Sequence, residues 1–205
     1  MLRHSIRQFA ISLLRKTIAW PPLPMTPDRK REVIRSYTNN QQDLVFVESG
    51  TFRGDTVAAM RPFFRELVSI ELFAELYLAA CNRFEGDDKV KIVQGDSGEV
   101  LPMVVNHIEG PIIYWLDGHY SGAGTGSSKE TECPIIAELD AIIARGNPKD
   151  VILIDDARLF GWRPGYPGKR ILREIVSKQL PAHALAVVED IIVNHPKGLH
   201  PVKAG

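Results

Sequence analysis

The sequence predicts an α/β fold, a doubly wound and mostly parallel seven-stranded sheet with helices on both faces and a C-terminal antiparallel strand pair. First, from Leu44 onward, short apolar runs alternate five times with segments of helical periodicity. Second, most of these runs are almost continuously apolar, which is typical of strands buried on both faces of a parallel sheet. Third, the chain closes with two strand-like runs separated only by Glu189 and Asp190, which indicates a tight hairpin or one long bent strand.

The elements follow one another with few connecting residues. The expected strands cover residues 44–49, 67–72, 90–94, 111–117, 150–155, 183–188 and 191–194. The expected helices cover about 28–40, 55–66, 73–85, 98–107, 130–145 and 169–179.

Residues 1–20 form a further expected helix, because apolar residues recur there at helical spacing and its charged residues are all basic. Two interpretations stay open, of which we favour the first. The helix packs on the domain or on a second subunit of a homo-oligomer, or it lies on an anionic membrane surface as a peripheral contact. Four prolines between Pro21 and Pro27 then form a stiff linker. We therefore divide the chain into residues 1–27 and a domain of residues 28–205.

The overall composition excludes several classes of protein. Lys and Arg number 25, as do Asp and Glu, so no global positive field favours nucleic acid. Cys81 and Cys133 fit neither a metal spacing nor a disulfide framework, which favours a reducing, cytoplasmic location. No apolar run reaches the roughly 18 residues of a membrane span.

The segment from Glu48 to Gly54 joins the first strand to its helix. It has the pattern acidic-x-Gly-x-x-x-Gly and lacks the dinucleotide fingerprint G-x-G-x-x-G, since Phe52 and Asp55 stand where glycines would be needed. We expect free backbone N–H groups and a helix N-terminus here, where a nucleotide-like ligand can bind. The alternative is a turn that needs Gly50 and Gly54 for backbone reasons alone.

Each of the first five strands ends in an acid, and this recurrence is the strongest signal in the sequence. In an open parallel sheet, ligands bind beyond the carboxyl ends of the strands. A carboxylate at the end of the second strand can accept hydrogen bonds from both ribose hydroxyls of a nucleoside. The acids in question are Glu48, Glu71, Asp96, Asp117 and the pair Asp155–Asp156.

These residues resemble the motifs of the class I S-adenosylmethionine (SAM)-dependent methyltransferases over about residues 40–196. The resemblance implies that Glu71 binds the ribose and that Glu48 faces the ammonium group of the methionine end. Asp96 and Ser97 would lie at the adenine, although either could instead cap a helix. The implied cofactor-binding residues are Glu48, Gly50, Thr51, Gly54, Glu71, Asp96, Ser97 and Asp117.

Asp117, Asp155 and Asp156 resemble the metal ligands of the metal-dependent small-molecule O-methyltransferases, and we call them the acid cluster. In that resemblance they would bind Mg²⁺, which would lower the pKa of a substrate hydroxyl. The catechol-type enzymes carry a lysine base where this chain has Tyr120, so His119 is the candidate base beside Asp117. The alternative for His119 is a loop histidine that makes structural hydrogen bonds. The alternative for the acid cluster is helix capping with a salt bridge to Arg158 or Arg163.

Two loops complete the expected site. Residues 118–128 are rich in Gly and Ser and form a lid over the substrate or a flexible linker. The loop from Phe160 to Pro167 offers aromatic rings and Arg163 to a substrate, or it is a packed surface loop.

The resemblance implies O-methylation of a small hydroxylated molecule or a sugar. The alternatives are a non-catalytic SAM-binding or assembly protein, and a nicotinamide-dependent oxidoreductase on a similar sheet.

Overall fold

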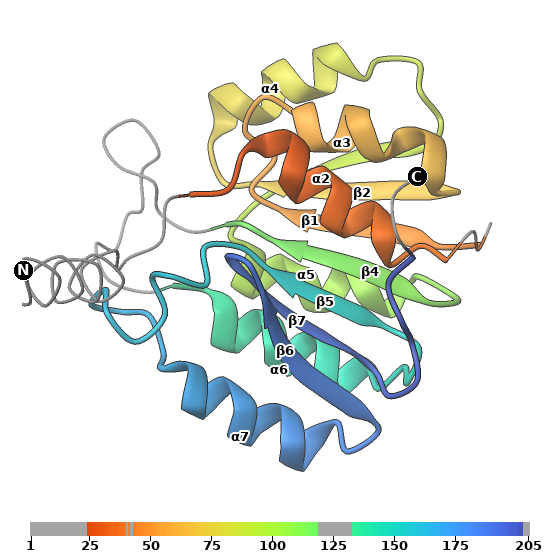
Figure 1. The fold of residues 1–205 in the computed structure, drawn as a ribbon. Coiled ribbons are helices and arrows are strands. Elements are labelled where there is room, and N and C mark those ends of the chain that lie inside the picture. Colours follow the sequence, from red (N-terminus) through yellow and green to blue (C-terminus); the bar gives the residue numbers. More distant parts are fainter. Residues whose placement is uncertain (1–23, 40, 42, 119–132, 203–205) are drawn as a thin grey trace, which may run out of the picture.

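The computed structural model describes residues 24–39, 41, 43–118 and 133–202. The expected helix at 1–20, the candidate base His119 and most of the loop 118–128 lie outside the described residues. Within the described part, the chain forms one seven-stranded sheet between two layers of helices (Figure 1).

The strand order is β3-β2-β1-β4-β5-β7-β6, which confirms the doubly wound sheet. The parallel strands are β1 (Val45–Ser49), β2 (Glu66–Glu71), β3 (Val90–Gln94), β4 (Ile112–Leu116) and β5 (Val151–Ile154). The remaining strands, β6 (His183–Val188) and β7 (Ile191–Pro196), pair antiparallel with each other, and β7 pairs antiparallel with β5. The final segment is therefore a hairpin and not one bent strand.

The helices are α2 (Pro27–Ser36), α3 (Asp55–Met60), α4 (Ala74–Arg83), α5 (Ser97–Asn106), α6 (Ile135–Arg145) and α7 (Lys169–Gln179). α3 is shorter than the expected helix at 55–66. It gives way to a three-residue 3-10 turn, η1 (Arg61–Phe63), because Pro62 lacks the N–H that would continue the α-helix. Strand β2 then begins at Glu66, one residue earlier than expected.

The two faces of the sheet carry separate apolar cores. One core contains side chains of α2 and α3, such as Ile34 and Met60, packed on Phe46 and Trp115 of the sheet. The other contains side chains of α5, α6 and α7 packed on the opposite face of the same strands. Figure 1 shows α2, α3 and α4 on one side of the sheet and α5, α6 and α7 on the other. Among the described residues, no helix is long and apolar enough to cross a membrane.

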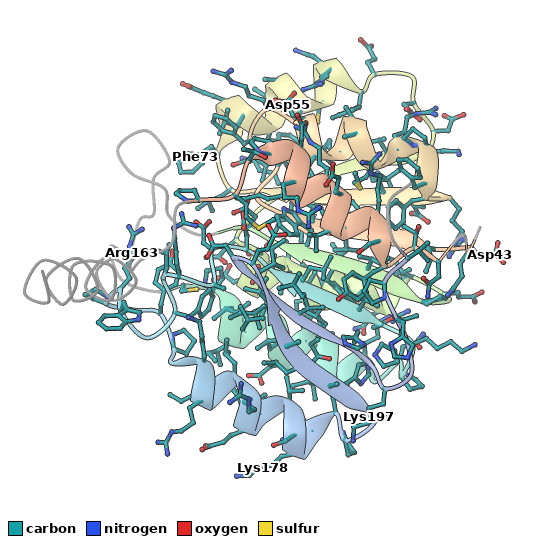
Figure 2. The ribbon with its side chains drawn as sticks, viewed as in Figure 1. Asp43, Asp55, Phe73, Arg163, Lys178 and Lys197 are labelled. Carbon is teal, nitrogen blue, oxygen red and sulfur yellow. The ribbon has the colours of Figure 1, made fainter. Side chains whose placement is uncertain are left out.

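The direction of strand addition reverses between β1 and β4, which are neighbours in the sheet. Strands β1, β2, β4 and β5 are parallel, so all four end at one edge. Phe73, which follows β2, lies at this edge, and Asp43, which precedes β1, lies at the opposite edge (Figure 2). Ligands of doubly wound sheets bind at such a reversal, beyond the carboxyl ends of the strands.

Candidate functional site

Residues 50–54, which we call the glycine loop, connect β1 to α3 at this edge. Gly50 has a φ of +90° and Gly54 a φ of +75°, both in the left-handed region. A Cβ atom on Gly50 would lie 2.8 Å from the backbone oxygen of Asp117, and one on Gly54 would lie 2.7 Å from the Phe84 ring. Both positions therefore need glycine for backbone reasons, and Gly50 allows β1 and β4 to come close where they end.

The expectation of free N–H groups in the glycine loop is largely wrong. The N–H groups of Gly50 and Thr51 both donate to the Ile70 carbonyl, at 2.9 and 3.3 Å. The Gly54 N–H donates to the Thr51 carbonyl at 2.7 Å, and the Phe52 N–H donates to Glu71 Oε2 at 2.8 Å. Three of these N–H groups therefore hold the loop against β2 and a fourth closes the loop on itself, so the loop shapes the site more than it donates to a ligand.

Gly50→Ala is expected to cost about 2 kcal/mol or more in unfolding free energy, because the methyl group meets backbone and φ is unfavourable. Gly86→Ala is the matched control, since Gly86 has a φ of +79° but nothing within 4 Å of its added Cβ. It should cost only about 1 kcal/mol, from the φ angle alone. Urea unfolding of both variants measures the difference. Equal costs would show that the contact with Asp117 does not constrain the loop.

Glu71 is held at the end of β2 by two backbone donors. Its Oε2 accepts the Phe52 N–H at 2.8 Å, and its Oε1 accepts the Phe73 N–H at 3.0 Å. A carboxylate offers about four acceptor sites, so both oxygens retain capacity for further donors. Glu71 is thus held in one orientation at the end of β2, and the ribose contact stays a prediction.

Glu48 lies inside the protein and not at a solvent-facing edge. Its side chain is on the α2 and α3 side of the sheet, where Oε2 accepts a hydrogen bond from the Ser69 hydroxyl at 2.6 Å. The Ser69 hydroxyl also lies 2.7 Å from the Thr51 hydroxyl. Burial raises the pKa of Glu48 to about 8, with the Glu71 carboxylate adding to the effect. Burial therefore opposes the negative charge that was expected to face a cofactor ammonium, and that contact stays a prediction.

Asp96 and Ser97 open helix α5. Asp96 is its N-cap, with Oδ1 accepting the Gly98 N–H at 2.9 Å, and Ser97 is its buried first residue. The capping alternative is therefore confirmed for Asp96. A contact of either residue with an adenine stays a prediction.

The acid cluster is engaged by two basic side chains, one from the distant helix α2 and one from the segment that follows β5. Lys30, on α2, contacts Asp155 Oδ2 directly and lies 3.7 Å from Asp156 Oδ1. Arg158 donates from Nη1 to Asp156 Oδ1 at 2.7 Å, and it also pairs with the buried Asp190 of the β6–β7 turn. The salt bridge to Arg158 that the sequence left as an alternative is thus present, and Lys30 adds a second one.

Burial dominates the titration of this cluster. It raises the pKa of Asp117 well above the ordinary value, with repulsion from Asp155 adding to it and attraction to Lys30 opposing it. Burial likewise raises the pKa of Asp155, again opposed by Lys30. For Lys30 burial alone would lower the pKa, but the carboxylates outweigh it and the pKa is raised overall. Lys30 is therefore an ammonium group over the physiological range.

The acid cluster as arranged does not fit a divalent cation. Within the part of the chain that the structure describes, no three His, Cys, Asp or Glu side chains are grouped so that they could hold a metal ion. Asp155 is completely buried against Lys30, and Asp156 is paired with Arg158. Hard cations such as Mg²⁺ need carboxylate oxygens that can turn toward the ion, and here fixed cations already engage those oxygens. The structure therefore gives no support to the Mg²⁺ expected from the resemblance.

The loop from Phe160 to Pro167 is packed into the protein in part, and its role in substrate recognition stays a prediction. Phe160 is buried, and its ring meets the Tyr166 ring edge-on with centroids 5.3 Å apart, so these two aromatics pack into the protein. Their use as a substrate surface is corrected accordingly. Trp162 is 72% exposed and remains accessible to a substrate.

Sequence reasoning missed two ionisable residues near the site, the partly buried Lys30 and the completely buried Glu138. Lys30 lies in a polar helix whose pattern does not distinguish it from its basic neighbours. Glu138 is completely buried on α6, where burial raises its pKa and the Ser97 and Ser49 hydroxyls oppose the rise. A signal for Glu138 did exist, because it lies on the apolar stripe of α6 between Ile135 and Ile142.

No protein-family model matches the sequence, and no curated protein matches it either. Solved structures do match in fold. The O-methyltransferase TomG from Streptomyces achromogenes, involved in tomaymycin synthesis and solved with SAM, has a TM-score of 0.62 at 16% identity. The match covers 89% of this chain and 86% of TomG.

Two further structures extend the comparison. An O-methyltransferase from Bacillus cereus, solved with S-adenosylhomocysteine (SAH), has a TM-score of 0.65 at 14% identity over 92% of this chain and 89% of its own. A putative rRNA methylase from Clostridium thermocellum has a TM-score of 0.59 at 11% identity over 85% of this chain and 99% of its own. At such identities the likeness is one of fold, and the chain has the fold of the class I SAM-dependent methyltransferases.

Proposed function

We propose that this protein is a SAM-dependent methyltransferase that methylates a hydroxyl group of a small molecule or a sugar. The observation that carries the proposal is the position of Glu71. Its carboxylate is held by the Phe52 and Phe73 N–H groups at the end of β2, beside the glycine loop and the strand reversal. A carboxylate held in this way could accept hydrogen bonds from both hydroxyls of a ribose, and the structures similar in fold include methyltransferases solved with SAM and SAH.

When bound, SAM supplies a methyl group on a positively charged sulfur. In O-methylation the new oxygen–carbon bond forms as the sulfur–carbon bond breaks, and the hydroxyl proton passes to a base. We assign the base to His119, with Asp117 beside it in the sequence. A histidine suits this role because its pKa lies close to the working pH. The residues of the glycine loop and Glu71 would orient the nucleoside so that the methyl group faces the end of β4.

The alternatives have less support. A nicotinamide oxidoreductase would be expected to carry the G-x-G-x-x-G pattern, which this glycine loop lacks. An RNA substrate is raised by the rRNA methylase among the similar structures. RNA binding relies on excess positive charge, however, whereas this chain has 25 basic and 25 acidic residues. A non-catalytic SAM-binding protein would bind SAH equally well, and turnover alone distinguishes it.

SAH should bind with micromolar affinity, roughly −8 kcal/mol, and Glu71→Ala should weaken it by about tenfold to a hundredfold. The reason is that the variant removes the acceptor of the two ribose hydroxyls. Isothermal titration calorimetry measures both affinities.

The control for this experiment is Glu75→Ala, which removes an exposed acid on α4 and should leave SAH binding unchanged. Glu71→Gln shows whether weaker SAH binding comes from loss of the hydrogen bonds that Glu71 accepts from the Phe52 and Phe73 N–H groups. Glutamine keeps one acceptor oxygen, so it can still accept one of these two bonds. Binding of NADH without a response to SAH would refute the cofactor assignment. Wild-type affinity in Glu71→Ala would refute the ribose role.

Other assignments stay predictions. They are the division of the chain at residues 27 and 28, the packing or membrane contact of residues 1–20, a homo-oligomeric state and a cytoplasmic location. Assistance by Mg²⁺ also stays a prediction, and the ion pairs of Lys30 and Arg158 weigh against it.

A further inference from the structure

Lys30 brings a positive charge to the carboxyl ends of the central strands from outside the sheet. Its Nζ atom contacts Asp155 Oδ2 and lies 3.7 Å from Asp156 Oδ1. The Lys30 side chain is 20% exposed, and that of Asp155 is completely buried. The contact therefore joins residues 125 positions apart in the sequence within a partly buried environment.

Helix α2 holds Lys30 beside Asp155 through contacts of the residues that precede and follow Lys30 in the helix. The preceding residue, Arg29, donates from Nε and Nη2 to Glu189 Oε1 at 2.9 and 2.6 Å, which joins α2 to the β6–β7 turn. Val33 and Ile34, in the next turn of the helix, are buried in the core beneath it. The Lys30 ammonium is therefore fixed by the fold of the domain and does not reach the acids as a loose surface side chain.

Two of the three carboxylates in the acid cluster already pair with protein cations. Arg158 lies between Asp156 and Asp190, and Lys30 lies against Asp155. A divalent ion bound to Asp155 and Asp156 would have to share their oxygens with the Lys30 ammonium. Like charges at such short range repel strongly in a partly buried site. Either the ion or the ammonium can take that position, but not both.

We propose that the Lys30 ammonium takes the place of a divalent cation at the acid cluster, so that this site works without a resident metal ion. Lys30 is then a positioning residue, which fixes Asp155 and offsets the charge of the cluster beside the reacting groups. The claim that methyl transfer proceeds without a metal ion rests on the proposed function. The competition between Lys30 and a divalent ion does not depend on it, and it can be measured without SAM or substrate.

Manganese binding followed by electron paramagnetic resonance tests the competition, because free Mn²⁺ gives a signal that is lost on binding. At about 1 mM Mn²⁺ the wild-type protein should leave the signal of the free ion unchanged. This result would mean that its dissociation constant for Mn²⁺ is weaker than about 1 mM. Lys30→Gln should bind one Mn²⁺ per chain at least about tenfold more tightly than wild type does. Asp155→Asn in the Lys30→Gln background should abolish that binding.

Two further variants separate displacement of an ion from a loss of structure. Lys30→Arg keeps the positive charge and should exclude Mn²⁺ as wild type does. If Lys30 had only a structural role, a positive charge at this position would not be enough for Lys30→Arg to exclude Mn²⁺. Lys178→Gln, which removes an exposed lysine on α7, should bind no ion.

The proposal is overturned if wild type binds stoichiometric Mn²⁺ that Asp155→Asn removes, or if Lys30→Gln gains no ion. Failure of SAH to bind wild type would instead refute the proposed function and leave this result standing.

Discussion

Lys30→Met should lower the free energy of unfolding by about 3–5 kcal/mol, the usual cost of removing one partner from a buried ion pair. Asp155 has a completely buried side chain, and Lys30 is the basic side chain in contact with it. Its other oxygen accepts a hydrogen bond from the Asp156 N–H at 2.7 Å. Methionine matches the carbon stem of lysine up to Cε and keeps its apolar contacts, so the loss comes from removing the ammonium group. Urea unfolding at pH 7 measures the change.

A double-mutant cycle shows whether the cost belongs to the pair. Asp155→Asn keeps the acceptor for the Asp156 N–H and removes the buried charge. The double variant Lys30→Met/Asp155→Asn should therefore recover most of the stability that Lys30→Met loses.

The matched control for the cycle is Lys91→Met. Lys91 pairs with Glu66 at 2.7 Å, but its side chain is 64% exposed, so the variant should cost at most about 1 kcal/mol. Equal losses in Lys30→Met and Lys91→Met would mean that the buried pair contributes no more than a surface pair.

Elements dominated by local pattern could be predicted from the sequence. The bounds of β3 and α7 are those expected, because a run such as Val90–Gln94 is delimited by turn residues on both sides. The acids at the strand ends were also identified, since parallel strands bring their carboxyl ends to one edge whatever the details of packing. The class of fold and the location of the site follow from these two regularities alone.

Contacts between distant elements could not be predicted in the same way. Lys30 meets Asp155 because α2 packs across the sheet with a particular rotation, which the sequence of α2 does not specify on its own. The use of the glycine-loop N–H groups depends on how closely β2 approaches, and this turned expected donors to a ligand into internal hydrogen bonds. The acid cluster was correctly located but its partners were not, and the partners decide whether a metal fits.

Glu48→Gln should make the protein more stable than wild type at pH 9 and equally stable at pH 4. The carboxyl has a pKa of about 8 in the folded protein against an ordinary value of 4.5, mainly because it is completely buried. The folded state thus holds a proton that the unfolded state releases between these two values. The contribution of Glu48 to the free energy of unfolding has its full value below pH 4.5. It falls as the pH rises to about 8 and is constant above that.

Each pH unit in this window changes the wild-type stability by about 1.4 kcal/mol, which sets a total on the order of 4–5 kcal/mol as an upper bound. Glutamine keeps the acceptor for the Ser69 hydroxyl and cannot ionise, so the variant should lack this part of the slope. Urea unfolding of both proteins from pH 4 to pH 9 gives the difference, in which the titration of other groups cancels. Glu75→Gln, at an exposed acid, should follow wild type throughout. Parallel profiles for wild type and Glu48→Gln would mean that Glu48 is ionised in the folded protein, which would return it to the charged role that the sequence suggested.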